Sequence, residues 1–128
     1  MKKQIRVIVK EPGHKSTVKE MVVDLKSLQG IVEGMIEIVP LPNLDGVDIV
    51  LNEEGKLLEL APNVFLPEYD DLVVGNIVVC GFDEETGGHR SLTDNEVKKA
   101  QAFLEKNDAD GFTGDILDFI RVEFFSFD

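Results

Sequence analysis

The feature that most constrains the fold is a continuous apolar run, LVVGNIVVCGF, at residues 72–82. A strand with one face in water alternates apolar and polar side chains, whereas a strand covered on both faces is apolar along its length. The run also falls short of the about 20 apolar residues that a membrane helix needs. The sequence therefore predicts a long strand at the centre of a sheet, with a bulge or bend at Gly75.

The rest of the chain alternates short strand patterns with turn residues. Four strands are predicted from alternating or β-branched segments, at residues 4–9, 17–24, 35–41 and 47–52. Pro12 and Gly13 lie between the first two strands and predict a hairpin turn. Further along, KLLELAPN is either a returning strand or a helical turn, VFLPEYDD is an extended loop, and HRSL is a short returning strand.

Two helices are predicted from apolar spacing and capping residues. In residues 25–34 apolar side chains recur at helical spacing after Asp24, an N-cap residue, and Gly34 is a natural stop. In SLTDNEVKKAQAFLEKN, Thr93 and Glu96 predict a capping box, in which each side chain accepts a hydrogen bond from a free backbone N–H.

The C-terminal tail is rich in phenylalanine, with four of the eight Phe residues in the last ten positions. We expect residues 115–121 to be helical and residues 121–127 to form a closing strand, so that the tail docks on the domain. An exposed tail would instead be a partner-binding patch. The element order predicts an α+β fold in a single domain over residues 1–128, with a mixed or mainly antiparallel sheet packed by two or three helices.

The net charge of −12 is unevenly spread along the chain. Residues 1–26 carry seven basic and three acidic side chains, whereas residues 65–128 carry five basic and fifteen acidic ones. Because acidic surfaces repel phosphate backbones, direct nucleic-acid binding is disfavoured, with the mildly basic N-terminal hairpin left open as an exception. The acidic surface either keeps the protein soluble or binds a basic partner. The candidates for an acidic interaction face are Asp83, Glu84, Glu85, Asp108 and Asp110.

Location and redox state follow from the first residues and the single cysteine. The start, MKKQIRVIVKEPGHK, lacks the continuous apolar stretch and cleavage site of a secretory signal, so we expect a cytoplasmic protein without a membrane segment. One cysteine, Cys80, excludes an internal disulfide. Because it lies in an apolar run, we expect a small buried thiol.

Familiar catalytic and metal-binding patterns are missing from the sequence. KNDADGFTGD approaches a calcium loop, but with Gly111 at position six, Lys106 and Leu117 stand where the first and last ligands belong, so we expect a helix end and an Asp-Gly turn. His14 and His89 lie in predicted turns without local partner ligands. We find no nucleophile elbow and no phosphate loop, and therefore expect no catalytic residue, metal or cofactor.

The stretch NEEGKLLELAPN contains adjacent carboxylates, Glu53 and Glu54, that could be an acid pair. Consecutive strand residues point to opposite faces, so the two groups do not share a proton. The residues NEEGK instead predict a turn that begins at Asn52 and has positive φ at Gly55. Asn63 either braces the hairpin through hydrogen bonds to its backbone or faces a ligand. The ligand or partner candidates are Asn52, Lys56 and Asn63.

Three segments resemble the domain of unknown function 3846 family: G-x-I-E-I-V from Gly34 to Val39, N-E-E-G-K-L from Asn52 to Leu57, and the pair Pro62–Asn63. The resemblance covers about residues 4–100, and residues 101–128 are a C-terminal extension. It implies a small protein of Gram-positive bacteria, their phages and conjugative elements, with no established catalytic residues. Where relatives often have a proline-rich or basic stretch after the Asn, this chain reads VFLPEYDD.

Two functions agree with these features. We expect a non-enzymatic accessory protein of a phage or mobile element that binds a host protein, such as a defence or nucleic-acid enzyme, through its acidic C-terminal half. The alternative is a small-molecule or nucleotide-binding module, with a pocket lined by the basic N-terminal hairpin and Asn63. An enzyme would need convergent polar groups in a cleft. A homodimer stays open.

Overall fold

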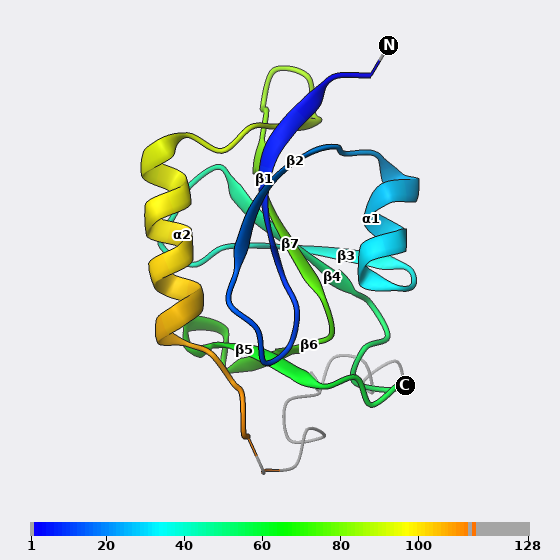
Figure 1. Cartoon of the computed structure of the whole chain (residues 1–128), viewed down its shortest axis with the longest axis vertical. Helices are drawn as coiled ribbons and strands as arrows, with labels where there is room; N and C mark the ends of the chain where they lie inside the picture. Colours follow the sequence, from blue (N-terminus) through cyan, green and yellow to red (C-terminus); the bar gives the residue numbers. More distant parts are fainter. Residues whose placement is uncertain (1, 113, 115–128) are drawn as a thin grey trace, which may run out of the picture.

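Eight strands and two helices make up the structure, a computed structural model that describes residues 2–112 and 114 (Figure 1). The strands are β1 (Gln4–Lys10), β2 (Thr17–Val22), β3 (Ile36–Pro40), β4 (Val47–Asn52), β5 (Pro62–Leu66), β6 (Asp71–Val74), β7 (Ile77–Phe82) and β8 (His89–Arg90). The helices are α1 (Leu25–Val32) and α2 (Asp94–Lys106), with a short 3-10 helix, η1 (Pro67–Tyr69).

The strands form two antiparallel sheets. The larger sheet has the order β2-β1-β7-β4-β3, with β8 paired to the end of β7, and the smaller sheet pairs β5 with β6. Every strand pair within the described residues is antiparallel. The predicted α+β class is therefore confirmed in its mainly antiparallel form, with two α-helices packed on the large sheet.

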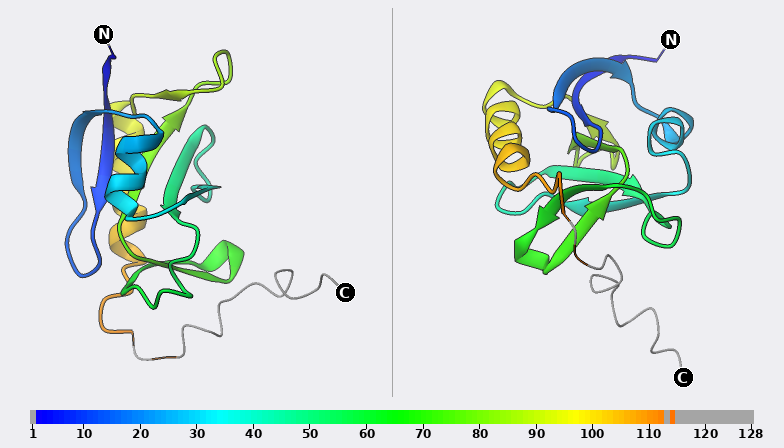
Figure 2. Two further views of the ribbon diagram at one scale, coloured as in Figure 1. Left: turned by 90° about the vertical axis from the view of Figure 1, so that its right-hand side faces the viewer. Right: turned by 60° about the horizontal axis from the view of Figure 1, so that its bottom comes forward.

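The central strand β7 is buried from Ile77 to Gly81 because both faces of the large sheet are covered. On one face β7 packs under α1 in a cluster with Leu28 and Val32. On the other face it meets α2 and the small sheet in a larger cluster that includes Leu104 and Leu66. Figures 1 and 2 show α1 and α2 on opposite sides of this sheet. The prediction of a central, doubly covered strand is confirmed.

The apolar run that contains β7 is nevertheless two strands, not one. Its first part is β6, which belongs to the small sheet, and the chain reverses at Gly75, whose φ is +79°. The position needs glycine for this left-handed conformation, and a Cβ there would also displace the end of the Leu60 side chain, whose Cδ1 would lie 2.7 Å away. The predicted bend was right in place, but it separates two sheets.

The predicted extended loop at VFLPEYDD is wrong, because these residues contain the last part of β5, the whole of η1 and the first residue of β6. Asn63, Val64 and Leu66 are buried. The segment that follows α2 lies against the other edge of β5, where the Phe65 N–H donates to the Asn107 carbonyl at 2.8 Å. The two prolines interrupt nothing, because Pro62 begins the strand and Pro67 begins the 3-10 turn.

Both predicted helices are present, and both caps are confirmed. Asp24 caps α1 by accepting from the Ser27 N–H at 2.8 Å, and Thr93 with Glu96 forms the capping box of α2. The end of α1 differs from the prediction, because Glu33 and not Gly34 takes the left-handed conformation, with φ of 65°. The helix and strand predicted in residues 115–127, and the docking of the tail, lie outside the described residues.

Candidate functional site

The residues from 53 to 60, which we name the leucine turn, connect β4 to β5. Its first brace is Asn52, which is 3% exposed. The Asn52 Oδ1 accepts a hydrogen bond from the Glu54 N–H at 2.8 Å, and its Nδ2 donates to the Val32 carbonyl at 3.0 Å. Asn52 therefore starts the turn, as predicted, and also ties it to the end of α1. Within the turn, the Leu58 N–H donates to the Glu54 carbonyl at 2.9 Å, which matches the helical-turn alternative.

Two further braces hold the leucine turn on the small sheet. Gly55 is buried, and a Cβ there would lie 2.9 Å from Val74 Cγ2. The predicted positive φ at Gly55 is wrong, since glycine is needed for this close approach and Glu59 takes the left-handed conformation instead. Lys56 forms an ion pair with Asp71, which is 9% exposed.

The outward side of the leucine turn is apolar at its tip. Leu57 is 70% exposed and Leu58 is 56% exposed. Three exposed glutamates, Glu53, Glu54 and Glu59, flank the pair. Two neighbouring leucines are thus held in water by a turn whose polar anchors are buried, which reverses the usual placement.

The third candidate from this stretch, Asn63, lies apart from the leucine turn and has no exposed surface. Its Nδ2 donates to the carbonyls of Lys10 and Gly75 at 2.9 and 2.8 Å. Its Oδ1 accepts from the Lys10 ammonium at 2.7 Å. Asn63 therefore braces backbone, as one alternative predicted, but the backbone belongs to β1 and to the turn between β6 and β7.

Lys10, which the sequence analysis did not single out, is 2% exposed. Its ammonium contacts Asn63 and lies 3.2 Å from the Asp108 carboxylate, so the buried charge is neutralised and hydrogen-bonded. The alternation of β1 places Lys10 on the same face as the buried Ile8. The alternation of the strand could have identified Lys10 from the sequence, because a lysine on the apolar face of a strand needs a buried partner.

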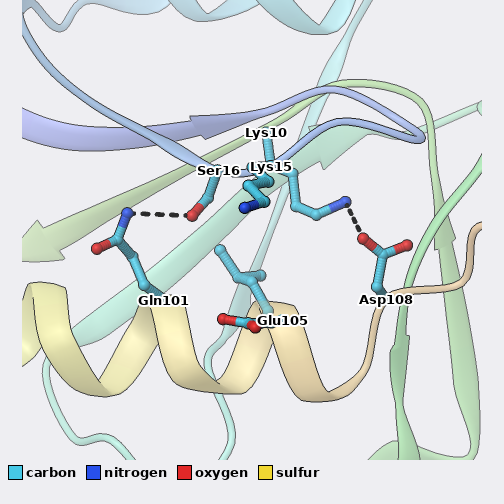
Figure 3. A pocket seen from close by; sticks show the side chains of 7 residues that line it. Lys10, Lys15, Ser16, Gln101, Glu105 and Asp108 are labelled. Carbon is cyan, nitrogen blue, oxygen red and sulfur yellow. Dashed lines mark hydrogen bonds and ion pairs between the residues drawn. The ribbon is translucent and has the colours of Figure 1, made fainter.

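A pocket of about 200 Å³, which we name the hairpin pocket, lies between the β1–β2 hairpin and the second half of α2 (Figure 3). Gln101 spans it, donating to the Ser16 hydroxyl at 3.2 Å. The buried Leu104 of α2 is also part of the lining. The pocket is lined by Lys10, Lys15, Ser16, Gln101, Leu104, Glu105 and Asp108.

The acidic candidates do not come together in one face. Asp83, Glu84 and Glu85 form the loop between β7 and β8, at the top of Figure 1. Asp108 and Asp110 follow α2 at the opposite end, where neighbouring Ala109 packs in the same cluster as Leu60 of the leucine turn. Only this second pair lies at the same end of the molecule as the exposed leucines.

The segment that approached a calcium loop is a helix end followed by a turn, as predicted. The helix ends at Lys106, Asp108 Oδ1 accepts from the Asp110 N–H at 2.7 Å, and Gly111 has φ of +81°. Across residues 2–112 and 114, no group of three or more His, Cys, Asp or Glu side chains is arranged to hold a metal ion.

Cys80, His89 and Asp48 are neighbours on β7, β8 and β4, a combination that can indicate nucleophilic catalysis. The Cys80 sulfur lies 3.3 Å from His89 Nδ1, but it has no exposed surface. Burial, reinforced by the Asp48 charge, raises the pKa of the Cys80 thiol to about 12. Burial also raises the pKa of Asp48. The thiolate is the reactive form of cysteine, and burial and the raised pKa both disfavour it here. Cys80 is therefore a core residue, as predicted.

The fold and these contacts define a small α+β domain with a braced turn that carries two exposed leucines and with a charged pocket. The family model described as Domain of unknown function (DUF3846) matches residues 5–105, and the chain belongs to this family. No curated protein matches the chain, and no solved structure does either. No helix within the described residues has the length and apolar character that crossing a membrane requires.

Proposed function

We propose that the protein binds a partner protein through the leucine turn and that it works by this contact, not as an enzyme. The observation that carries the proposal is the exposed pair Leu57 and Leu58. Among the described residues, no other two large hydrophobic residues that are exposed follow each other in the chain. Single exposed leucines are ordinary on protein surfaces, but a neighbouring pair on a braced turn is an apolar patch.

The bracing of the turn favours binding. Asn52, Gly55 and Lys56 fix the backbone that leads into the leucines through the contacts described above, and after the leucines the Leu60 N–H donates to the Gly55 carbonyl at 3.0 Å. A segment that is already ordered loses little conformational entropy when it binds, so more of the contact energy appears as affinity.

The chemistry of the partner follows from magnitude and charge. Burying two leucine side chains contributes about 3–6 kcal/mol, whereas micromolar affinity needs about 8 kcal/mol. The remainder must come from other contacts, and the groups around the leucines are Glu53, Glu54 and Glu59. A matching partner therefore has an apolar pocket rimmed by Lys or Arg. Asp108 and Asp110 lie at the same end of the molecule, but Asp108 is paired with Lys10 and Asp110 lies beside Gly13 of the β1–β2 hairpin, so the three glutamates alone form the acidic rim.

The biological setting is proposed from the family resemblance. We propose a cytoplasmic accessory protein of a phage or mobile element, whose partner is a host protein such as a defence or nucleic-acid enzyme. Such enzymes carry basic surfaces for nucleic acid, and these surfaces complement the glutamates of the leucine turn.

The test compares capture of partners by the full chain and by two variants. Leu57→Ser with Leu58→Ser should lose the partner, whereas Leu25→Ser should retain it, since Leu25 is 58% exposed but lies on α1. Raising the salt concentration should weaken capture by the unchanged chain, because the rim contacts are between charges. Equal capture by all three proteins, or capture insensitive to both salt and the leucines, would refute the proposal.

A further inference from the structure

We infer that the hairpin pocket binds a small zwitterion of the size of a free amino acid. This site goes beyond the proposed partner contact and shares no residue with the leucine turn. The pocket contains two charged pairs of opposite sign. Lys10 and Asp108 already neutralise each other. Lys15 and Glu105 form no ion pair with any other residue of the described chain.

Lys15 and Ser16 make the anion-binding side of the pocket. Both come from the β1–β2 hairpin, and the Lys15 ammonium faces the space between the hairpin and α2 in Figure 3. The Ser16 hydroxyl accepts its hydrogen bond from Gln101, so its own hydrogen is available to donate to a carboxylate. An ammonium and a hydroxyl donor side by side suit a ligand carboxylate.

Glu105 makes the cation-binding side. It projects from α2 across the pocket from the hairpin and is exposed. Asp108 lies just beyond the end of α2, but its two oxygens already serve the Lys10 ammonium and the Asp110 N–H. A ligand ammonium is therefore held by Glu105 first, with the Asp108 charge adding attraction at longer range.

The volume and charge of the pocket exclude a nucleotide, the larger of the two ligand classes predicted from the sequence. The pocket holds about 200 Å³, below the about 300–1,000 Å³ of pockets for drug-sized molecules. Because Lys10 and Asp108 neutralise each other, Lys15 is left to attract an anion, and the Glu105 carboxylate in the same pocket offsets that attraction for the several negative charges of a nucleotide's phosphates.

The experiment records amide NMR spectra of the full chain while each protein amino acid is added at millimolar concentration. At least one amino acid should give saturable shifts centred on Ser16 and Glu105. Its N-acetyl and carboxamide derivatives, which each lack one charge, should bind at least about tenfold more weakly, because a charged hydrogen bond is lost. ATP, tested in the same way, should give no saturable shift in the pocket.

Variants then assign the charges. Lys15→Ala should weaken binding at least about tenfold, and Glu105→Gln should do the same. The matched controls Lys19→Ala and Glu20→Gln change exposed residues of β2 outside the pocket and should leave binding unchanged. All four positions are exposed, so folding should be retained, and urea unfolding checks this.

Four results would each contradict the inference. The first is a flat response to every amino acid. The second is binding of the N-acetyl and carboxamide derivatives as tight as that of the amino acid, and the third is unchanged binding by both pocket variants. Saturable ATP binding in the pocket would likewise contradict the charge argument.

Discussion

The stretch from Asn52 to Asn63 buries polar side chains at its two ends and exposes apolar side chains in its middle. At both ends an asparagine is buried, and its amide ties together backbone from distant parts of the chain. In the middle Leu57 and Leu58 stand in water. The difference teaches that the fold depends on the polar ends of this stretch and not on its most apolar residues.

The strongest test of this difference is the variant Asn63→Ala. It leaves the carbonyls of Lys10 and Gly75 without their donor and removes an acceptor from the buried Lys10 ammonium. We expect a loss of about 3–5 kcal/mol in the free energy of unfolding, measured with urea. The control Asn76→Ala removes one bond, to the Ile31 carbonyl, and should cost about 1 kcal/mol. Equal costs would show that Asn63 is not the special anchor.

The second test removes the ion pair beneath the leucine turn. Lys56→Met keeps the aliphatic length but removes the ammonium that forms an ion pair with the largely buried Asp71 carboxylate. We expect a loss of about 2 kcal/mol in unfolding free energy, because a partly buried charge loses its partner. Lys19→Met, at an exposed position of β2, should change stability by less than about 0.5 kcal/mol. A loss no larger than this control would mean that Lys56 does not brace the turn.

The third test uses two glycines with opposite expected signs. Gly55→Ala places a methyl group 2.9 Å from Val74 Cγ2 and should destabilise by about 1–2 kcal/mol through overpacking. Gly30→Ala lies inside α1 with open space around the new Cβ, so it should stabilise by about 0.5–1 kcal/mol. The melting temperature should fall for Gly55→Ala and rise for Gly30→Ala. A change of the same sign in both variants would contradict the close approach at Gly55.

The smallest effect is expected at the tip of the turn. Leu57→Ser with Leu58→Ser should change the unfolding free energy by less than about 0.5 kcal/mol, because both side chains are already mostly in water. Leu104→Ala, in the core between α2 and the sheet, should cost about 2–5 kcal/mol. A large loss at the tip would show that the leucines are covered in the folded protein, which would undermine the proposed contact.

Local patterns carried much of the fold. The capping box of Thr93 and Glu96 and the N-cap Asp24 were readable because each depends on side chains within three residues. The central, doubly covered β7 was readable from its unbroken apolar run. What failed was assignment to sheets, because β6 and β7 have the same composition and only the left-handed Gly75 sends them to different partners.

The sites were less predictable, because their meaning depends on distant residues. Asn52 and Lys56 stood out in the sequence, but their roles required the positions of Val32 and Asp71. Lys10 was missed, since only the return of the chain after α2 supplies Asp108 as its partner. The predicted location of a pocket at the basic hairpin agrees with the hairpin pocket, although Asn63 stands behind Lys10 and does not line it.

The central position of β7 has a consequence for the order of assembly. The pairs β1–β2 and β3–β4 are each local in the chain, but they join only through β7, which is made after both. Pairing of strands that are distant in the chain is slow, because the entropy of loop closure is lost before the strand contacts form. As the chain leaves the ribosome, two separate hairpins must therefore wait until residue 82 has emerged, and only then can a single strand close the sheet between them.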